Sequence, residues 1–246
     1  MKLGKATPKH DSRTLLLSNY LVPELQPPPS SVDWTTQIHE WGMMLNDKVG
    51  CCTCATAAHM IQTWTSNEQP YFLPTDDEVI YAYSSISGYE PSTGLNDNGA
   101  AELDVLNYWR KTGIAGHKIY AFASISPGHV NHIKNAVWLF GWCYLGLALP
   151  LSAQGDKLWD VWDVVDGPKG DPGSWGGHAV PIVAYDEVGP YCVTWGELKH
   201  MTWAFFEKYC DEAYAILSVD WYAQDMKSPN GFDVAMLQRD LKSVAC

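Results

Sequence analysis

The sequence predicts an α+β fold, because helical patterns fill its first half and short β patterns fill its second half. Hydrophobic residues make up 46% of the 246 residues and charged residues 18%, a balance typical of a folded globular protein. A chain of this length is long enough for one domain with a full core, which can be divided into two lobes around a cleft.

Residues 1–31 are predicted to form an N-terminal arm ahead of the globular part. The arm begins with polar residues, carries three leucines at 15–17 and ends in prolines at 27–29, which favour an extended spacer. Because three exposed leucines would be an unfavourable apolar patch, we expect this cluster to dock on the domain. The alternative is that the arm blocks or lines a cleft.

Three helices are predicted in the first half of the chain, each from a different signal. The first carries small residues and Ile61 at helical spacing, the second opens on acidic residues that suit a helix N-terminus, and the third ends before Gly113. The predicted helices are residues 52–65, a helix opening at 75–78, and residues 100–111. A loop rich in Gly, Pro, Ser, Asn and Asp is predicted at 88–99.

Short β patterns separated by long loops follow in the second half. Their predicted ranges are 118–122, 144–149, 178–185, 191–195 and 213–219. Pro181 is awkward inside a central strand, so we expect an edge strand or a bulge there. The apolar run 137–151 is too short to span a membrane and contains Gly and Pro, so it predicts a buried strand or helix.

The charge balance excludes several classes of partner. A formal net charge of −12 argues against nucleic acid and against an anionic membrane surface, since both need a basic footprint. No apolar run approaches the length of a spanning helix, and the first residues lack the apolar core of a secretory signal. The prediction is therefore a cytoplasmic protein that binds neither nucleic acid nor membrane.

Seven cysteines, an odd number without a secretory signal, favour reduced thiols. Cys51 and Cys54 form a CxxC pair, which is compatible with a metal or redox role. No second pair completes four zinc ligands, so no metal and no cofactor are predicted.

Cys52 and His178 are the residues that indicate chemistry. Cys52 falls at the first turn of a predicted helix, where the helix dipole favours a thiolate. His178 opens an apolar strand after a glycine-rich loop, where a base could face a cleft. Each has a plain structural alternative, a small core cysteine and a hydrogen-bonded core histidine.

Several segments resemble the papain-like cysteine peptidases, in order along residues 32–222. Val32-Asp33-Trp34 resembles the start of the mature domain in that family, and Asn46 and Cys52 follow Trp34 at offsets of twelve and eighteen, where the family has its oxyanion glutamine and its nucleophile. Residues 177–186 resemble the strand with the catalytic histidine, and 193–196 resemble the Asn-Ser-Trp-Gly element. The spacing before the cysteine is also similar to that of a branch found in phage and bacterial genomes.

The resemblance implies a papain-like two-lobed fold and a thiol-dependent hydrolase acting on peptides or proteins. It implies a helical lobe at about 32–115, a β lobe at about 116–222 and a C-terminal tail at 223–246. Cys52 would be the nucleophile, His178 the base and Asn46 an oxyanion donor. The residues implied to line the substrate cleft are Asn98, Gly99, Gly177 and Trp195.

The chain departs from the family pattern at the position of the catalytic Asn. Val193 aligns there and cannot accept a hydrogen bond from the histidine, whereas Thr194 offers a hydroxyl only if the register shifts by one, because adjacent strand residues face opposite sides. Thr53 also replaces the family's Trp after the nucleophile. The second hypothesis is therefore a catalytically impaired papain-like protein with a binding or structural role.

Two other residues compete for roles at the site. Cys54 is an alternative nucleophile, but it lies two residues deeper in the predicted helix. His59 lies seven residues beyond Cys52, about 10 Å along the same helix, which is too far for a base. We expect His59 to be a packed or surface histidine.

Overall fold

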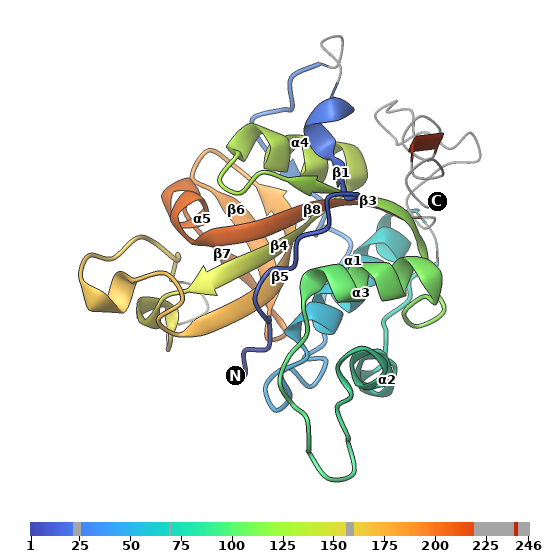
Figure 1. Cartoon of the computed structure of the whole chain (residues 1–246). Helices are drawn as coiled ribbons and strands as arrows, with labels where there is room; N and C mark the ends of the chain where they lie inside the picture. The colour runs from blue at the N-terminus through green and yellow to red at the C-terminus, as the bar shows by residue number, and fades with distance from the viewer. Residues whose placement is uncertain (22–25, 69, 156–159, 219–238, 241–246) are drawn as a thin grey trace.

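An eight-stranded sheet with helices on both of its faces forms the framework of the computed structural model (Figure 1). The structure describes residues 1–21, 26–68, 70–155, 160–218 and 239–240. The strands are β1 (Leu15–Leu16), β2 (Val32–Asp33), β3 (Ile119–Ile125), β4 (Cys143–Leu149), β5 (Gly176–Tyr185), β6 (Pro190–Thr194), β7 (Glu197–His200) and β8 (Cys210–Ser218). Their order is β1-β3-β8-β4-β5-β6-β7, with β2 beside β5.

Five α-helices are present among the described residues. They are α1 (Cys52–Glu68), α2 (Asp76–Ser87), α3 (Glu102–Lys111), α4 (Val130–Phe140) and α5 (Trp203–Tyr209). Neighbouring residues of β4 belong to different hydrophobic clusters, since Tyr144 packs in the cluster of α1–α3 and Leu145 in that of α4 and α5. This alternation is what a strand buried on both faces requires.

The α+β prediction is confirmed, and so are the three helices of the first half. Thr75 caps α2 in a capping box with Glu78, which satisfies backbone N–H groups at the helix start. The apolar run 137–151 was predicted to be a buried strand or helix, and it contains parts of both. Helix α4 ends at Gly141, which has the left-handed conformation with φ of +82°, and strand β4 follows. The short elements α5 and β7 were not predicted.

Pro181 does not lie at an edge, because β5 is flanked by β4 and β6. Its neighbour across the sheet is Tyr144 of β4, while pairing with β6 begins at Ile182 and shifts register before Ala184. The missing N–H of Pro181 therefore falls beside a break in the ladder, which is the bulge alternative of the prediction.

The N-terminal arm docks on the far edge of the sheet. Leu15 and Leu16 pair in parallel with β3, and Leu17 is fully buried. No helix among the described ranges is long and apolar enough to cross a membrane. The division into two lobes stays a prediction, and most of the predicted tail at 223–246 lies outside the described residues.

Candidate active site

Cys52 is the first residue of α1 and lies against β5. Its side chain is buried, and the backbone N–H of Ala179 donates to its sulfur at 3.5 Å. The Tyr144 hydroxyl donates to the carbonyl oxygen of Thr53 at 2.6 Å, which fixes the first turn of α1 to β4. The cysteine at the helix start is therefore next to the residue that follows His178.

His178 is buried and makes one hydrogen bond through its ring. Its Nε2 lies 2.7 Å from Oγ1 of Thr194. Trp195 stacks on the ring, with centroids 4.5 Å apart and planes inclined by 13°. Among the described residues, Nδ1 of His178 has no hydrogen-bond partner. The ring is thus fixed at one nitrogen and free at the other.

The partner of His178 is set by a tight turn between β6 and β7. Thr194 pairs with Glu197, so Trp195 and Gly196 form a two-residue connection, and both have positive φ (+48° and +75°). Positive φ at both positions is typical of the type I′ turns that close hairpins. Thr194 faces the histidine, to which it is hydrogen-bonded, whereas its strand neighbour Val193 packs in the α1–α3 cluster. Thr194, the alternative that the sequence offered at this position, is thus the hydrogen-bond partner of His178.

Asn46 is held in a buried turn ahead of α1. Met44 and Leu45 both have positive φ, +54° and +55°, which is unusual for non-glycine residues and is common near functional sites. The Asn46 amide donates to the carbonyl oxygens of Val49 at 3.2 Å and Lys2 at 3.4 Å. Asn46 thus already binds a backbone carbonyl, one that belongs to the N-terminal arm.

Residues 1–6 pass over Cys52 in an extended conformation, between the sheet and the α1–α3 helices (Figure 1). The Gly4 N–H donates to the Cys52 sulfur, and the Gly4 carbonyl accepts from the N–H of Ala100 at 2.9 Å. On the other side, the N–H of Lys5 donates to the carbonyl of Gly177 at 3.1 Å. The arm both docks by its leucines and covers the candidate nucleophile.

Glycines make this close passage possible. A Cβ placed on Gly99, whose φ is +78°, would overlap the carbonyl oxygen of Gly4, and a Cβ on Gly177 would overlap the carbonyl oxygen of Lys5. Gly99 and Gly177 therefore both line the channel of the arm. The side chain of Asn98, predicted to line the cleft beside them, is exposed.

Asp97 connects the loop before α3 to the start of α1, and the sequence analysis missed it. Its Oδ1 accepts from the Gly50 N–H at 2.9 Å and from the Tyr83 hydroxyl at 2.9 Å, and the Lys2 ammonium pairs with its Oδ2. Tyr83 in turn accepts from the Gly99 N–H at 2.9 Å. The aspartate within a run of loop residues at 96–99 was the available signal.

Burial keeps both candidate catalytic groups neutral in this arm-covered form. Burial raises the pKa of Cys52 to about 12, although the N–H donors of Ala179 and Gly4 act in the opposite direction. Burial lowers the pKa of His178 to about 3. A neutral thiol and a neutral imidazole are therefore the stable state while the arm is in place.

The competing residues lie deeper in α1. Cys54 is fully buried and burial raises its pKa to about 12. His59 is a packed histidine, which is one of the two alternatives predicted for it. Its Nε2 lies 2.8 Å from the Gly42 carbonyl oxygen, and Trp41 lies edge-on to its ring. Cys51 donates to the carbonyl of Met44 at 3.3 Å. Within the described ranges, no three His, Cys, Asp or Glu side chains group together as metal ligands.

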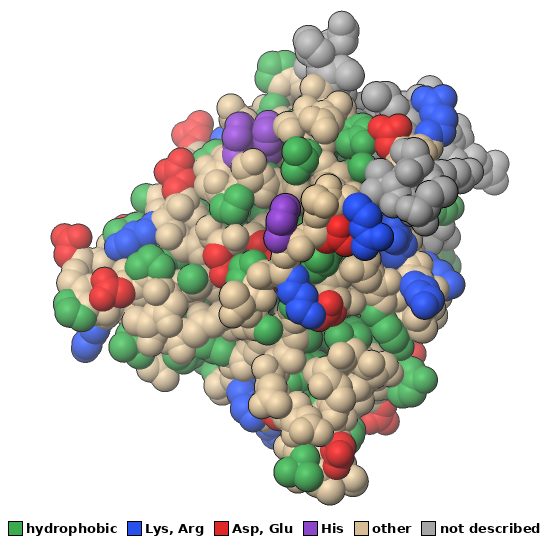
Figure 2. Space-filling view, viewed as in Figure 1, with side chains coloured by type: hydrophobic (Ala, Val, Ile, Leu, Met, Phe, Trp, Pro, Cys, Tyr) green, Lys and Arg blue, Asp and Glu red, His purple; other side chains and the backbone are tan. Residues whose placement is uncertain are grey.

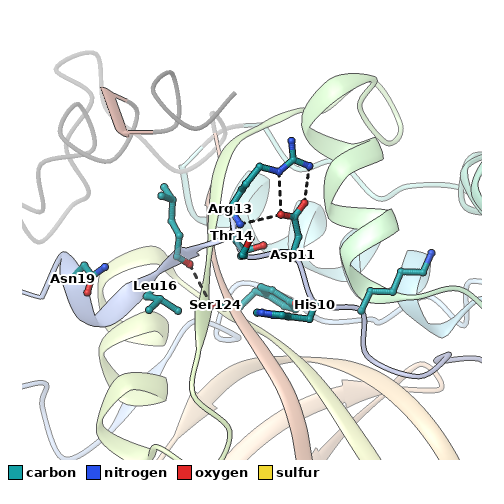
Figure 3. Close-up of a pocket in the computed structure, with 11 residues that line it drawn as sticks. His10, Asp11, Arg13, Thr14, Leu16, Asn19 and Ser124 are labelled. Carbon is teal, nitrogen blue, oxygen red and sulfur yellow. Dashed lines mark hydrogen bonds and ion pairs between the residues drawn. The ribbon is translucent and has the colours of Figure 1, made fainter. Parts of the chain in front are cut away.

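Two hollows flank the path of the arm. A cavity of about 210 Å³ is lined by Met1, Trp162, Thr194 and Trp195 among others, next to the histidine. A wider hollow of about 620 Å³ lies where the arm reaches β3, and Figure 3 shows the Arg13–Asp11 pair and Ser124 at its wall. Figure 2 shows basic and acidic side chains interspersed on this face of the molecule.

Solved structures share the fold of this chain, although neither a protein-family profile nor a curated protein sequence matches it. Xylellain, a cysteine protease from Xylella fastidiosa, superposes with a TM-score of 0.67 at 19% identity over 88% of this chain and 96% of its own. Procathepsin B S9 from Trypanosoma congolense gives 0.61 at 14% identity over 88% and 86%. Digestive procathepsin L2 from Tenebrio molitor gives 0.60 at 14% identity over 88% and 78%.

The fold is that of the papain-like cysteine peptidases, as the resemblance predicted. At 14–19% identity these likenesses establish the fold and not the reaction. The predicted likeness to a phage and bacterial branch stays a prediction.

Proposed function

We propose that this protein is a thiol-dependent hydrolase of peptide or related amide bonds, with Cys52 as nucleophile and His178 as base. The observation that carries the proposal is the hydrogen bond between Nε2 of His178 and the Thr194 hydroxyl, under the stacked ring of Trp195. A nucleophile, a base and a group that orients the base are the parts that this chemistry needs. The papain-like fold supports the same class of activity.

Thr194 would act as a positioning residue. In the tautomer that this mechanism needs, Nε2–H donates a hydrogen bond to the Thr194 hydroxyl oxygen and Nδ1 is unprotonated. Nδ1 is the nitrogen without a partner among the described side chains, so it is available to take the thiol proton. A threonine hydroxyl would thus do what the family's Asn does, and Trp195 would keep water from this bond.

The reaction would proceed in two steps through an acyl-enzyme. The Cys52 sulfur attacks the substrate carbonyl carbon while His178 holds the thiol proton, then delivers it to the leaving amine as the C–N bond breaks. Asn46 and the Cys52 backbone N–H would donate to the oxyanion, and the carbonyl of Lys2 is bound to Asn46 in the resting form. Water, deprotonated by His178, then releases the acid and restores the thiol.

The second candidate is a papain-like protein with a binding or structural role and little chemistry. The observation that favours it is the burial of Cys52 beneath residues 1–6, which raises the pKa of the thiol to about 12. Under this alternative the arm would be a permanent part of the fold.

Hydrolysis of a mixed peptide pool, followed by mass spectrometry in reducing buffer, separates the two candidates. We expect cleavage by the full chain that is lost in Cys52→Ala and in His178→Ala and kept in Cys54→Ala, the matched control in the same helix. Cleavage that survives Cys52→Ala, or no difference between the chain and both variants, would contradict the proposal.

A further inference from the structure

The side chain of Lys5 lies in a buried acidic pocket beside the candidate active site. Only 1% of this side chain is exposed, and its ammonium nitrogen lies 2.8 Å from Oδ2 of Asp211 and 3.1 Å from Oε1 of Glu212. An ammonium on a four-carbon stem is costly to bury without partners, and here two carboxylates supply them. Burial would lower the pKa of Lys5, but Glu102, Asp211 and Glu212 outweigh it and raise that pKa.

The walls of this pocket fit a long basic side chain. Gly146 of β4 leaves the space, because a Cβ there would overlap the terminal methylene of Lys5. Glu102, at the start of α3, is fully buried, and neither of its carboxyl oxygens has a hydrogen-bond partner among the described residues. Burial raises the pKa of Glu102, and the charge of the nearby Glu212 carboxylate raises it further. Asp211 and Glu212 form the two ion pairs with Lys5, so Glu102 is an additional acidic group of the pocket that makes no ion pair with Lys5.

The pocket is adjacent to the reacting groups. Gly146 is the cross-strand neighbour of Ala179, which follows His178 and donates to the Cys52 sulfur. The backbone of Lys5 is held by Gly177, one residue before His178. A peptide that took the place of the arm along these strands would put a side chain into the same pocket.

The arm itself is held on both of its sides by backbone hydrogen bonds. Gly4 presents its N–H to the Cys52 sulfur, and its carbonyl oxygen is bound to the N–H of Ala100 on the loop before α3. The carbonyl oxygen of Gly4 is thus bound by Ala100, whereas Asn46 is bound to the carbonyl oxygen of Lys2.

We propose that the pocket formed by Gly146, Glu102, Asp211 and Glu212 selects substrates with a lysine side chain, and that Lys5 fills it in the resting chain. The proposal rests on the proposed hydrolase function, because it names the substrate class of that site. Substrates would be peptides with a lysine placed a fixed distance from the cleaved bond, and they would have to displace the arm.

The pocket can be tested without any hydrolysis. In the full-length Lys5→Ala chain, n-butylammonium chloride at 100 mM should raise the melting temperature by about 2 °C or more, whereas n-butanol and NaCl should not. The same amine should leave the wild-type chain and the Lys9→Ala chain unchanged, since Lys9 makes an exposed ion pair with Asp104. Adding Gly146→Val to Lys5→Ala should abolish the shift. An equal response to the amine in all these chains would overturn the proposal.

Substrate selection is tested with acetylated hexapeptides in which each position in turn carries lysine or norleucine. For Lys5→Ala we expect kcat/KM at one position to favour lysine by about tenfold or more, and Glu212→Gln to remove most of that preference. Amine binding without lysine preference would make the pocket an anchor for the arm alone and would contradict the proposal.

If no peptide is cleaved, the hydrolase proposal fails and the pocket is judged by binding. Fluorescent peptides are then titrated into the Lys5→Ala, Cys52→Ala chain. Tighter binding of the lysine peptide than the norleucine peptide by about tenfold would support the pocket, and equal binding would refute it.

Discussion

The two sides of the candidate site are held in place by different means. On the sheet side, strand register and a two-residue turn bring His178, Thr194 and Trp195 together. On the helical side, Cys52 stands at the start of α1, and the turn before it contacts the arm through Asn46. The geometry of the base is therefore built into the sheet, whereas access to the nucleophile depends on residues 1–6.

The largest expected effect comes from the sheet side. Thr194→Val keeps the shape of the side chain but removes the acceptor for His178, so we expect kcat to fall by about 100-fold with little change in KM. Peptide hydrolysis at several substrate concentrations measures both constants. Val193→Ala is the matched control on the opposite face of the same strand and should change kcat less than about threefold. Equal losses in the two variants would show that Thr194 acts only through packing.

The next effect is on the helical side and concerns access. Lys5→Ala removes one partner of a buried ion pair, so the closed position of the arm should weaken and Cys52 should react with iodoacetamide about tenfold faster. Mass spectrometry of labelled peptides gives the rate for each cysteine. Lys9→Ala should leave the rate within about twofold, and an unchanged rate in Lys5→Ala would mean that the arm does not limit access.

Each side also contributes one buried histidine that titrates on unfolding. Burial lowers the pKa of His59 to about 4 and that of His178 to about 3, from 6.5. Between pH 6.5 and 4 the unfolded chain binds more protons at both positions, so each should cost about 1.4 kcal/mol of unfolding free energy per pH unit as the pH falls.

Urea unfolding at pH 6.5, 5.5 and 4.5 tests this for His59→Gln and His178→Gln separately. Each variant should show a pH dependence shallower than the wild type by about 1.4 kcal/mol per pH unit. Parallel curves for wild type and variants would show that these histidines are protonated in the folded chain.

The smallest expected effect lies outside the site. Thr75→Ala removes the capping box of α2 and should lower the unfolding free energy by about 1 kcal/mol, without changing kcat/KM by more than about twofold. Ser85→Ala, an exposed position on the same helix, should cost less. A loss of activity in Thr75→Ala would show that α2 contributes to the geometry of the site, against this prediction.

The sequence was sufficient for the parts of the fold with local signals. The acidic residues after Thr75, the small residues of α1 and the apolar run of β5 each define an element from within a few residues. Short elements such as α5 and β7 were missed, because they are too short to show a clear periodicity, and the position of β7 is set by its pairing with β6. The choice between strand and helix for the run 137–151 could not be made from sequence, because the run contains the end of a helix and a strand that meet near Gly141.

The site was only partly accessible from sequence for the same reason. Asn46, Cys52 and His178 were predicted from the resemblance and their roles stay a proposal, whereas the contact of Thr194 with His178 depends on which face of β6 meets β5, a tertiary property of the sheet. The role of Lys5 could not be inferred, since its partners Asp211 and Glu212 are more than two hundred residues away along the chain. Only the folded sheet brings them together.

The most direct test of the central claim is the rate of Cys52 alkylation by iodoacetamide against pH in the Lys5→Ala chain, with and without His178→Ala. If the free Nδ1 of His178 serves the thiol once the arm is loosened, Cys52 should label rapidly at pH 6 and lose this reactivity in the double variant. Slow labelling with a transition near the ordinary thiol value of about 8.5 in both chains would contradict a working Cys52–His178 pair.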